Sequence, residues 1–259
     1  MKNKKSLGQH WLKNRVILDE IADLTAGDSI EAGASLSSEK TGVVLEIGPG
    51  LGTLTSSLLK RFNKVIAVEY DENLAENLPK SFPGKNLEVI NADILDFDFA
   101  SIPQPYKVAG NIPYYITSPI LEKLLKVENR PERIVLLIQK EVAERIASDK
   151  ETMLSLFVKN YADVELGPVV GREEFTPPPK VDSQVIILEP HEAVVKEEMF
   201  KLIKRGFVAP RKKLIHNLAG LRPKEELVQI FGELGINADA RPGDLHLPDW
   251  QRLYDIVCR

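Results

Sequence analysis

Glu46-Ile47-Gly48-Pro49-Gly50-Leu51-Gly52 is the stretch of sequence that decides the fold. It follows an apolar run at 43–45 and precedes a segment with helical spacing that starts at Thr53. A strand, a glycine turn and a helix in this order form a loop that binds nucleosides or dinucleotides. The glycines allow a sharp turn and let the backbone approach a ligand where a side chain would collide. A tight turn without any ligand is the alternative interpretation.

The spacing of the three glycines separates two kinds of nucleoside loop. A NAD-type fingerprint reads G-x-G-x-x-G, and here the third glycine comes one residue early. The pattern Glu-x-Gly-x-Gly-x-Gly resembles the S-adenosylmethionine (SAM) loop of class I methyltransferases. That resemblance implies SAM as the cofactor.

The rest of the chain alternates apolar strand-like runs with amphipathic helix-like segments. Strands are predicted at 43–47, 64–69, 87–90, 106–109, 133–138, 164–169 and 183–188. Helices are predicted at 16–24, 53–61, 73–80, 119–127, 140–148 and 153–161. This alternation predicts an α/β fold with a mostly parallel, seven-stranded Rossmann-like sheet covered on both faces.

Helix-like patterns alone continue after Pro190, at 194–207, 223–234 and 248–257. We therefore predict a catalytic, SAM-binding domain at 1–190 and a small, all-helical RNA-binding domain at 191–259. The Gly-, Ser- and Ala-rich segment 27–42 is predicted to be a surface loop, with no function assigned to it.

Four candidate ligand-binding segments follow predicted strands: the glycine loop 46–52, Glu69, Asp93 and Asn111–Tyr114. The carboxyl ends of parallel strands meet at one edge of the sheet, where α/β folds bind their ligands. We therefore expect these four segments to form one site.

Composition narrows the class of protein. The 259 residues are 43% hydrophobic, which suits a water-soluble chain with a real core, and no apolar run is long enough to span a membrane. No apolar stretch follows the basic start, so no signal peptide is expected, and the single cysteine, Cys258, has no intrachain partner. A cytoplasmic location is expected. The four histidines lack metal-ligand spacing, so no metal is expected.

Basic residues are concentrated in two blocks although the net charge is −4. Residues 1–18 and 199–224 contain no acidic side chain. Their cations include Lys4, Lys5, Arg211, Lys212 and Lys213, which we predict to bind RNA. Such blocks on an acidic protein indicate a polyanion partner, although solvated faces are the simpler alternative.

Two carboxylates at strand ends suit a nucleoside cofactor. Glu69 lies 17 positions beyond Gly52, close to where such folds place the acid that binds the ribose hydroxyls. Asp93 is predicted to accept a hydrogen bond from the adenine amino group of the cofactor. A turn or helix-capping role is the alternative for Asp93.

Asn111-Ile112-Pro113-Tyr114 is the most specific stretch. An exocyclic adenine amine is a poor nucleophile, because its lone pair is delocalised into the ring. The Asn111 side-chain oxygen and a backbone carbonyl held by the proline can accept both amine hydrogens and aim the lone pair at a methyl donor. Tyr114 would stack on the base. Phe175, in the proline-rich loop 175–182, is predicted to stack on its other face, and Lys180 to meet a phosphate.

Four segments together, 5–12, 46–52, 111–114 and 175–183, resemble the KsgA/RsmA family of small-subunit ribosomal RNA adenine N6-dimethyltransferases, over nearly the whole chain. The resemblance implies dimethylation of two adjacent adenosines near the 3′ end of 16S rRNA, with the assembling 30S subunit as partner. The cofactor residues it implies are His10, Leu12, Gly48, Glu69, Asp93 and Asn111. We expect a monomer. At His10 the family often has asparagine, and Trp11 replaces the usual phenylalanine.

Other functions remain open on the sequence alone. An antibiotic-resistance enzyme that dimethylates large-subunit rRNA would share the fold and the Asn-x-Pro-Tyr motif. The proline loop and the basic residues 211–213 favour the small-subunit family. A DNA adenine methyltransferase would more often have an acidic or polar residue followed by two prolines. A non-catalytic ribosome assembly factor is disfavoured by the intact Asn111 and Tyr114.

Overall fold

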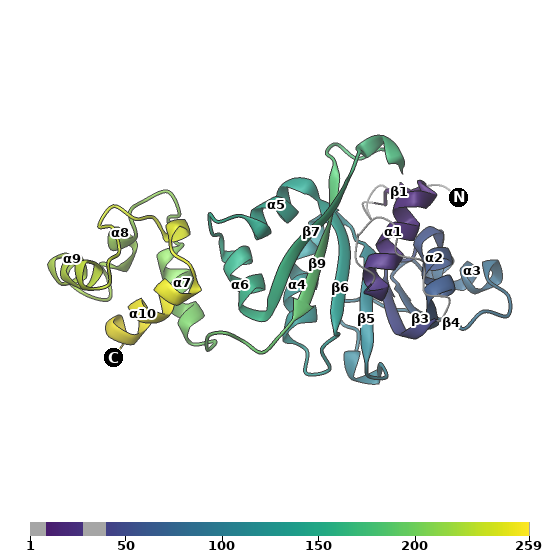
Figure 1. Cartoon of the computed structure of the whole chain (residues 1–259), viewed down its shortest axis with the longest axis horizontal. Coiled ribbons are helices and arrows are strands. Elements are labelled where there is room, and N and C mark those ends of the chain that lie inside the picture. The colour runs from purple at the N-terminus through teal and green to yellow at the C-terminus, as the bar shows by residue number, and fades with distance from the viewer. Residues whose placement is uncertain (1–8, 28–39, 259) are drawn as a thin grey trace. The chain divides into compact units, whose positions relative to one another are not determined.

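The computed structural model describes residues 9–27 and 40–258. Contacts divide the chain into two compact units (Figure 1). The first contains the described residues up to Ala143 together with Asp163–Pro190, and the second contains Glu144–Ala162 and the residues from His191 onward. Lys4, Lys5 and most of the predicted 27–42 loop lie outside the described residues.

The first unit is built on a seven-stranded sheet with the order β4-β3-β2-β5-β6-β9-β7. Its strands are β2 (Thr41–Ile47), β3 (Phe62–Glu69), β4 (Leu87–Asn91), β5 (Tyr106–Asn111), β6 (Arg133–Gln139), β7 (Ala162–Val170) and β9 (Ser183–Pro190). Neighbours from β4 to β6 pair in parallel, whereas β9 pairs antiparallel with β6. The predicted mostly parallel, Rossmann-like sheet is confirmed.

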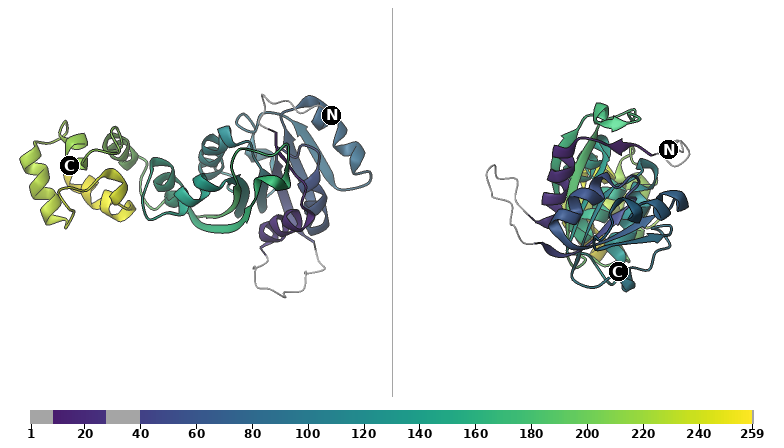
Figure 2. Two further views of the ribbon diagram at one scale, coloured as in Figure 1. Left: turned by 90° about the horizontal axis from the view of Figure 1, so that it is seen from above. Right: turned by 90° about the vertical axis from the view of Figure 1, so that its right-hand side faces the viewer.

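Helices of the first unit flank the sheet (Figure 2). They are α1 (Arg15–Ala26), α2 (Thr53–Arg61), α3 (Glu72–Asn77) and α4 (Thr117–Lys126). Two more helices, α5 (Lys140–Ala147) and α6 (Met153–Tyr161), follow β6 in the chain. The central strands are buried on both sides, which explains their near-continuous apolar sequences. Val44, Val65, Val108 and Val135 are all fully buried.

The glycine loop takes a backbone shape that other residues rarely adopt. Gly48, Gly50 and Gly52 have positive φ angles of 65°, 58° and 80°. A Cβ at Gly52 would lie 2.6 Å from the Leu78 side chain, so both the turn and the packing require glycine there. The loop thus links β2 to α2 in a backbone conformation that few substitutions of its glycines would allow.

A two-stranded sheet pairs β1 (Trp11–Leu12) antiparallel with β8 (Phe175–Thr176). Neither strand was predicted from the sequence, and Phe175 and Thr176 were expected in a loop. Strands of two residues show no periodicity, and their pairing joins segments about 165 positions apart. Only the tertiary structure reveals that the N-terminal segment lies beside the proline loop.

The second unit is helical. It adds α7 (Met199–Gly206), α8 (Leu214–Leu218), α9 (Lys224–Glu233) and α10 (Leu247–Val257) to α6 and the end of α5. Helices were predicted where α7, α9 and α10 lie, but α7 starts five residues later than predicted, and the short α8 was not predicted. By contacts, this unit contains 144–162 as well as the residues from His191 onward, and the predicted domains 1–190 and 191–259 stay a prediction.

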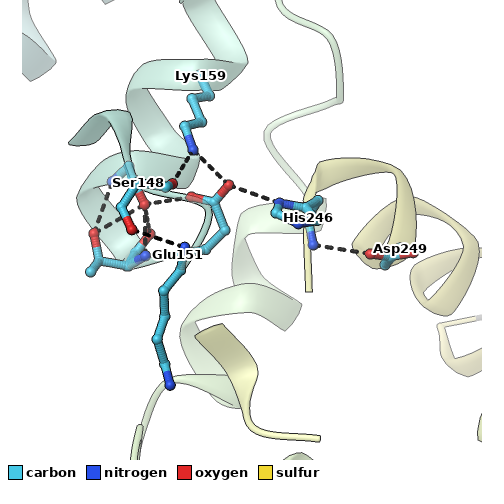
Figure 3. A network of polar contacts seen from close by, with 8 residues as sticks. Ser148, Glu151, Lys159, His246 and Asp249 are labelled. Atoms are coloured by element: carbon cyan, nitrogen blue, oxygen red, sulfur yellow. Dashed lines mark hydrogen bonds and ion pairs between the residues drawn. The ribbon is translucent and has the colours of Figure 1, made fainter. Parts of the chain in front are cut away.

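Glu151 explains why the 144–162 segment groups with the C-terminal helices (Figure 3). Its carboxylate is 4% exposed, and Oε1 accepts from Lys159 Nζ at 2.9 Å and lies 3.1 Å from His246 Nδ1. The Glu151 backbone N–H donates to Gly243 at 2.8 Å. The His246 backbone N–H in turn donates to Asp249 at 3.0 Å at the start of α10. A buried carboxylate with these partners is a strong local anchor.

Within residues 9–27 and 40–258, no helix combines the length and apolar character needed to cross a bilayer.

Candidate active site

A cavity of about 300 Å³ lies at the carboxyl ends of the parallel strands of the first unit. Residues 46–50 of the glycine loop, Glu69, Asp93 and Asn111–Tyr114 all line it, so the expected convergence of strand ends is confirmed. The six predicted cofactor residues lie together on its wall: His10, Leu12, Gly48, Glu69, Asp93 and Asn111. Residues 9–12 reach it from the N-terminal segment.

Glu69 fixes the shape of the glycine loop. Its Oε2 accepts from the Gly50 N–H at 3.0 Å, and its Oε1 accepts from the Asp71 N–H at 2.8 Å. Burial raises the pKa of Glu69, while the hydrogen bonds from these two N–H groups oppose the shift. Each carboxylate oxygen still has a lone pair for a ligand hydroxyl. The cavity therefore presents a preorganised pair of acceptors.

The residues around the cavity fit SAM. A Cβ added at Gly48 would meet no protein atom within 4 Å, so the loop backbone borders open space where a ligand can approach closely. The volume lies at the lower end of the range for small-molecule sites. Asp93 Oδ1 accepts from the Leu95 N–H at 2.9 Å, which fixes the carboxylate at the cavity wall. Glu69 and Asp93 are the residues that would hold the ribose and the adenine amine.

Glu46 is a cavity residue whose chemistry the sequence analysis did not foresee. It is 1% exposed, and its Oε2 has no hydrogen-bond partner among the described residues. Burial raises the pKa of Glu46 to about 8; hydrogen bonding with Thr55 opposes this shift, and the nearby charge of Glu69 adds to it. Glu46 therefore carries a proton at neutral pH. The sequence signals for it were its place at the end of a buried strand and at the start of the glycine pattern.

Glu46 should make the stability of the protein fall as the pH rises. The folded state holds its proton up to about pH 8, whereas the unfolded chain releases it near pH 4.5. The folded state therefore binds more protons across this window, and its stability declines as the pH rises through it. We expect Glu46→Gln to gain about 3 kcal/mol relative to the parent between pH 5 and pH 8. Urea unfolding of both proteins at the two pH values measures this, and parallel profiles would contradict it.

The Asn111–Tyr114 segment closes β5 at the cavity. Asn111 Nδ2 donates to the His10 carbonyl oxygen at 2.9 Å. The opposite assignment of the amide would set two acceptors against each other, so Nδ2 must face His10 and Oδ1 is the acceptor left for a ligand. Within the same motif, the carbonyls of Pro113 and Tyr114 accept from Ile116 and Thr117. The Ile112 carbonyl is thus the candidate second acceptor.

Tyr114 is held from two sides. Its hydroxyl lies 2.8 Å from Ser183 Oγ at the start of β9, and its ring is stacked with His10 at a centroid distance of 6.1 Å. Burial raises the pKa of Tyr114, with hydrogen bonding from Ser183 opposing the shift. A ring fixed in this way is suited to stacking rather than to proton transfer.

Phe175 is not brought to the cavity. It is 3% exposed and packs in the core cluster that includes Leu12, Leu18 and Val185. Its pairing in β8 with Leu12 of β1 accounts for this burial. Stacking of Phe175 on a base is therefore unsupported by this arrangement and stays a prediction. Lys180, in the same loop, is exposed.

The predicted RNA-binding cations Arg211, Lys212 and Lys213 are exposed just before α8 in the second unit. Lys213 forms an ion pair of 2.5 Å with Asp239. The side chains of Arg211 and Lys212 are therefore the better candidates for phosphate contacts.

Two tyrosines on the cavity wall were not foreseen. Tyr70 follows Glu69 and Tyr115 follows Tyr114, and each is 64% exposed. Exposed aromatic rings at the edge of a cavity are suited to stacking on flat ligands. Their positions next to predicted site residues were a signal that the sequence contained. Among the described residues, no group of three or more His, Cys, Asp or Glu side chains could hold a metal ion.

Residues 1–258 match the family described as "Ribosomal RNA adenine dimethylase". "Ribosomal RNA small subunit methyltransferase A" of Picosynechococcus sp. is 40% identical, over 98% of this chain and 97% of the relative. The protein of the same name from Dehalococcoides mccartyi is 38% identical, over 98% of this chain and 88% of the relative.

Solved structures show the same likeness in three dimensions. A dimethyladenosine transferase from Plasmodium falciparum superimposes with a TM-score of 0.76 at 28% identity, covering 96% of this chain and 98% of that one. The 23S rRNA methyltransferase ErmE superimposes with a TM-score of 0.74 at 26% identity, covering 96% of this chain and 100% of that one.

Proposed function

Because this chain belongs to the ribosomal RNA adenine dimethylase family, we propose that it dimethylates N6 of two adjacent adenosines near the 3′ end of 16S rRNA. The enzyme is a SAM-dependent rRNA methyltransferase. Each adenosine would receive two methyl groups, so four SAM molecules would be used for each RNA. The assembling 30S subunit is the proposed partner, and the protein is proposed to act as a monomer in the cytoplasm.

One observation carries the proposal furthest: the amide of Asn111 is oriented with Oδ1 as the free acceptor at the cavity wall. With the Ile112 carbonyl, it supplies two acceptors for the two hydrogens of an adenine amine. Accepting both hydrogens favours a pyramidal nitrogen, whose lone pair can attack a methyl group. No general base is required before attack, because the amine loses its proton only after the new bond forms.

The remaining cavity residues orient the two reactants. Bound SAM would supply an electrophilic methyl group on a sulfonium ion. Glu69 and Asp93 would hold the nucleoside part of the cofactor at the glycine loop, and Tyr114 would stack on the target base. The base must leave its helix to enter a cavity of this kind, so the enzyme has to favour an unstacked adenosine. Tyr114, fixed by Ser183 and His10, loses little conformational entropy when it stacks.

The small subunit is favoured over the large subunit as the substrate. Two relatives named for the small subunit are 40% and 38% identical, whereas the large-subunit enzyme ErmE is 26% identical. The catalytic residues are intact, which disfavours a purely non-catalytic assembly factor. A decisive experiment incubates the protein with labelled SAM and unmethylated small subunits, with large subunits as the control. Label at two adjacent adenosines of 16S rRNA is expected, and label only in large subunits would overturn the proposal.

Arg211 and Lys212 are proposed to contact RNA phosphates, and the salt dependence of binding tests this. The double variant Arg211→Glu/Lys212→Glu should bind small subunits more weakly. Its slope of log K against log salt should become less negative by roughly 0.7–0.9 per lost phosphate contact. Lys213 is left unchanged because its charge is paired with Asp239. Lys80→Glu/Lys85→Glu, a change of equal charge at exposed lysines of the first unit, is the control. An equal change of slope in both variants would show a general charge effect only.

A further inference from the structure

The N-terminal segment and the proline loop are joined by the β1–β8 pairing beside the cavity. Leu12 pairs with Phe175 and Trp11 with Thr176, and the Lys13 N–H donates to the Glu174 carbonyl at 3.0 Å. Trp11 and Leu12 also line the cavity. A Cβ added at Gly50 would lie 3.1 Å from the Trp11 indole nitrogen, so this segment reaches the glycine loop itself. One small sheet therefore connects the cofactor side of the cavity to the proline loop.

His10 immediately precedes β1 and makes three separate contacts. Its carbonyl oxygen accepts from Asn111 Nδ2 at 2.9 Å. Its ring Nδ1 lies 2.7 Å from the Pro177 carbonyl oxygen, and its ring is stacked with Tyr114 at an interplanar angle of 21°. A carbonyl oxygen can only accept, so Nδ1 carries the proton of this hydrogen bond. The side chain is partly buried, and these contacts define its position.

We propose that the imidazole of His10 is a positioning group that couples SAM binding to adenosine binding, through its Nδ1–H hydrogen bond to Pro177. This inference rests on the proposed function and deepens it. The resemblance assigns His10 to the cofactor, whereas here its ring is directed to the proline loop and Tyr114. A cofactor that orders residues 9–12 would thereby also order the loop and the ring that receive the base. Coupling of this kind is reciprocal and commonly worth roughly 5- to 150-fold in affinity.

The geometry allows the two parts of the side chain to be tested separately. Asparagine keeps a side-chain N–H donor near the position of Nδ1 but has no ring. Phenylalanine keeps a flat ring for Tyr114 but cannot donate to Pro177. Neither change removes the main-chain carbonyl that orients Asn111. These variants therefore perturb the coupling without removing the proposed catalytic contact.

The experiment measures the dissociation constant of unmethylated small subunits with and without saturating sinefungin, a SAM analogue that has no methyl group to transfer. The ratio of the two constants is the coupling factor. For the parent we expect a factor of about ten, within the usual range. His10→Ala and His10→Phe should lower it to below about two, and His10→Asn should retain at least half. Sinefungin affinity in the absence of RNA is measured for every variant, so that a change in the coupling factor is separated from a change in cofactor binding.

A control variant matches the chemistry elsewhere. His191 Nδ1 lies 2.7 Å from the Glu192 carbonyl oxygen and does not line the cavity, so His191→Ala should leave the coupling factor unchanged. An unchanged factor in His10→Ala would overturn the inference. Recovery by phenylalanine but not by asparagine, or an equal loss in all three variants, would overturn the assignment to the hydrogen bond. Methylation of small subunits by the parent protein tests the proposed function independently, so the two can fail separately.

Discussion

Asn111→Ala should lower the rate of methyl transfer to small-subunit RNA to below about one-thousandth, while the dissociation constant of SAM stays within a few-fold. The Oδ1 acceptor acts on the amine in the transition state, and removing one such preorganised group typically costs roughly 10²–10³ in rate. Here the loss should be at least that large, because the alternative acceptor for the second amine hydrogen is water. Single-turnover methylation with labelled SAM measures the rate, and equilibrium dialysis measures the affinity.

Asn111→Asp is the matched control for this prediction. It keeps an acceptor oxygen and the size of the side chain, but a second oxygen replaces the N–H donor, so it cannot donate to the His10 carbonyl. We expect its rate to fall between those of the parent and Asn111→Ala. Near-normal turnover by Asn111→Ala would rule out the proposed mechanism. Equal loss in both variants would mean that the donor contact to His10, rather than the acceptor, is what matters.

The sheet could be predicted from the sequence because its strands are buried on both faces. Each of the seven strands was predicted within two residues at either end. Long apolar runs separated by helices leave few alternative arrangements, and right-handed crossovers then fix which edge carries the site. The convergence of Gly48, Glu69, Asp93 and Asn111 on one cavity followed from that rule alone.

Contacts between distant segments could not be predicted in this way. The pairing of β1 with β8 has no periodic signal, and it places Phe175 in the core rather than at the cavity. A proline-rich loop indicates rigidity, but it does not indicate which side of the loop faces a ligand. The contacts of His10 with Pro177 and Tyr114 depend on the same pairing. For this reason the role of the imidazole emerges only from the three-dimensional arrangement.

The grouping of 144–162 with the C-terminal helices could not be predicted from the sequence either. The helical pattern of α5 and α6 is continuous with the α/β alternation before it, so the sequence assigns both helices to the first domain. The decisive contacts are polar: Glu151 interacts with His246 and with Gly243, more than 90 positions later. A single buried carboxylate is not distinguishable in sequence from the exposed acids around it.

Glu69→Ala should raise the dissociation constant of SAM by roughly 10²–10⁴-fold. Two hydrogen bonds from ribose hydroxyls to a carboxylate are worth about 1.5–3 kcal/mol each, and every 1.4 kcal/mol changes affinity about tenfold. The variant also leaves the Gly50 and Asp71 N–H groups without their acceptor, so the glycine loop loses its anchor. Glu69→Gln retains one acceptor oxygen and presents a donor to the other N–H group. Its affinity should therefore be intermediate.

A SAM analogue without the 2′-hydroxyl separates these two effects of Glu69. If the carboxylate binds the ribose, removing the 2′-hydroxyl should weaken binding to the parent protein but have little effect on Glu69→Ala, because the partner group is already gone. If Glu69 only shapes the loop, the analogue should lose the same affinity in both proteins. An unaltered SAM dissociation constant in Glu69→Ala would exclude both roles. The loop geometry favours the first outcome, because each oxygen that holds a backbone N–H still has a lone pair at the cavity wall.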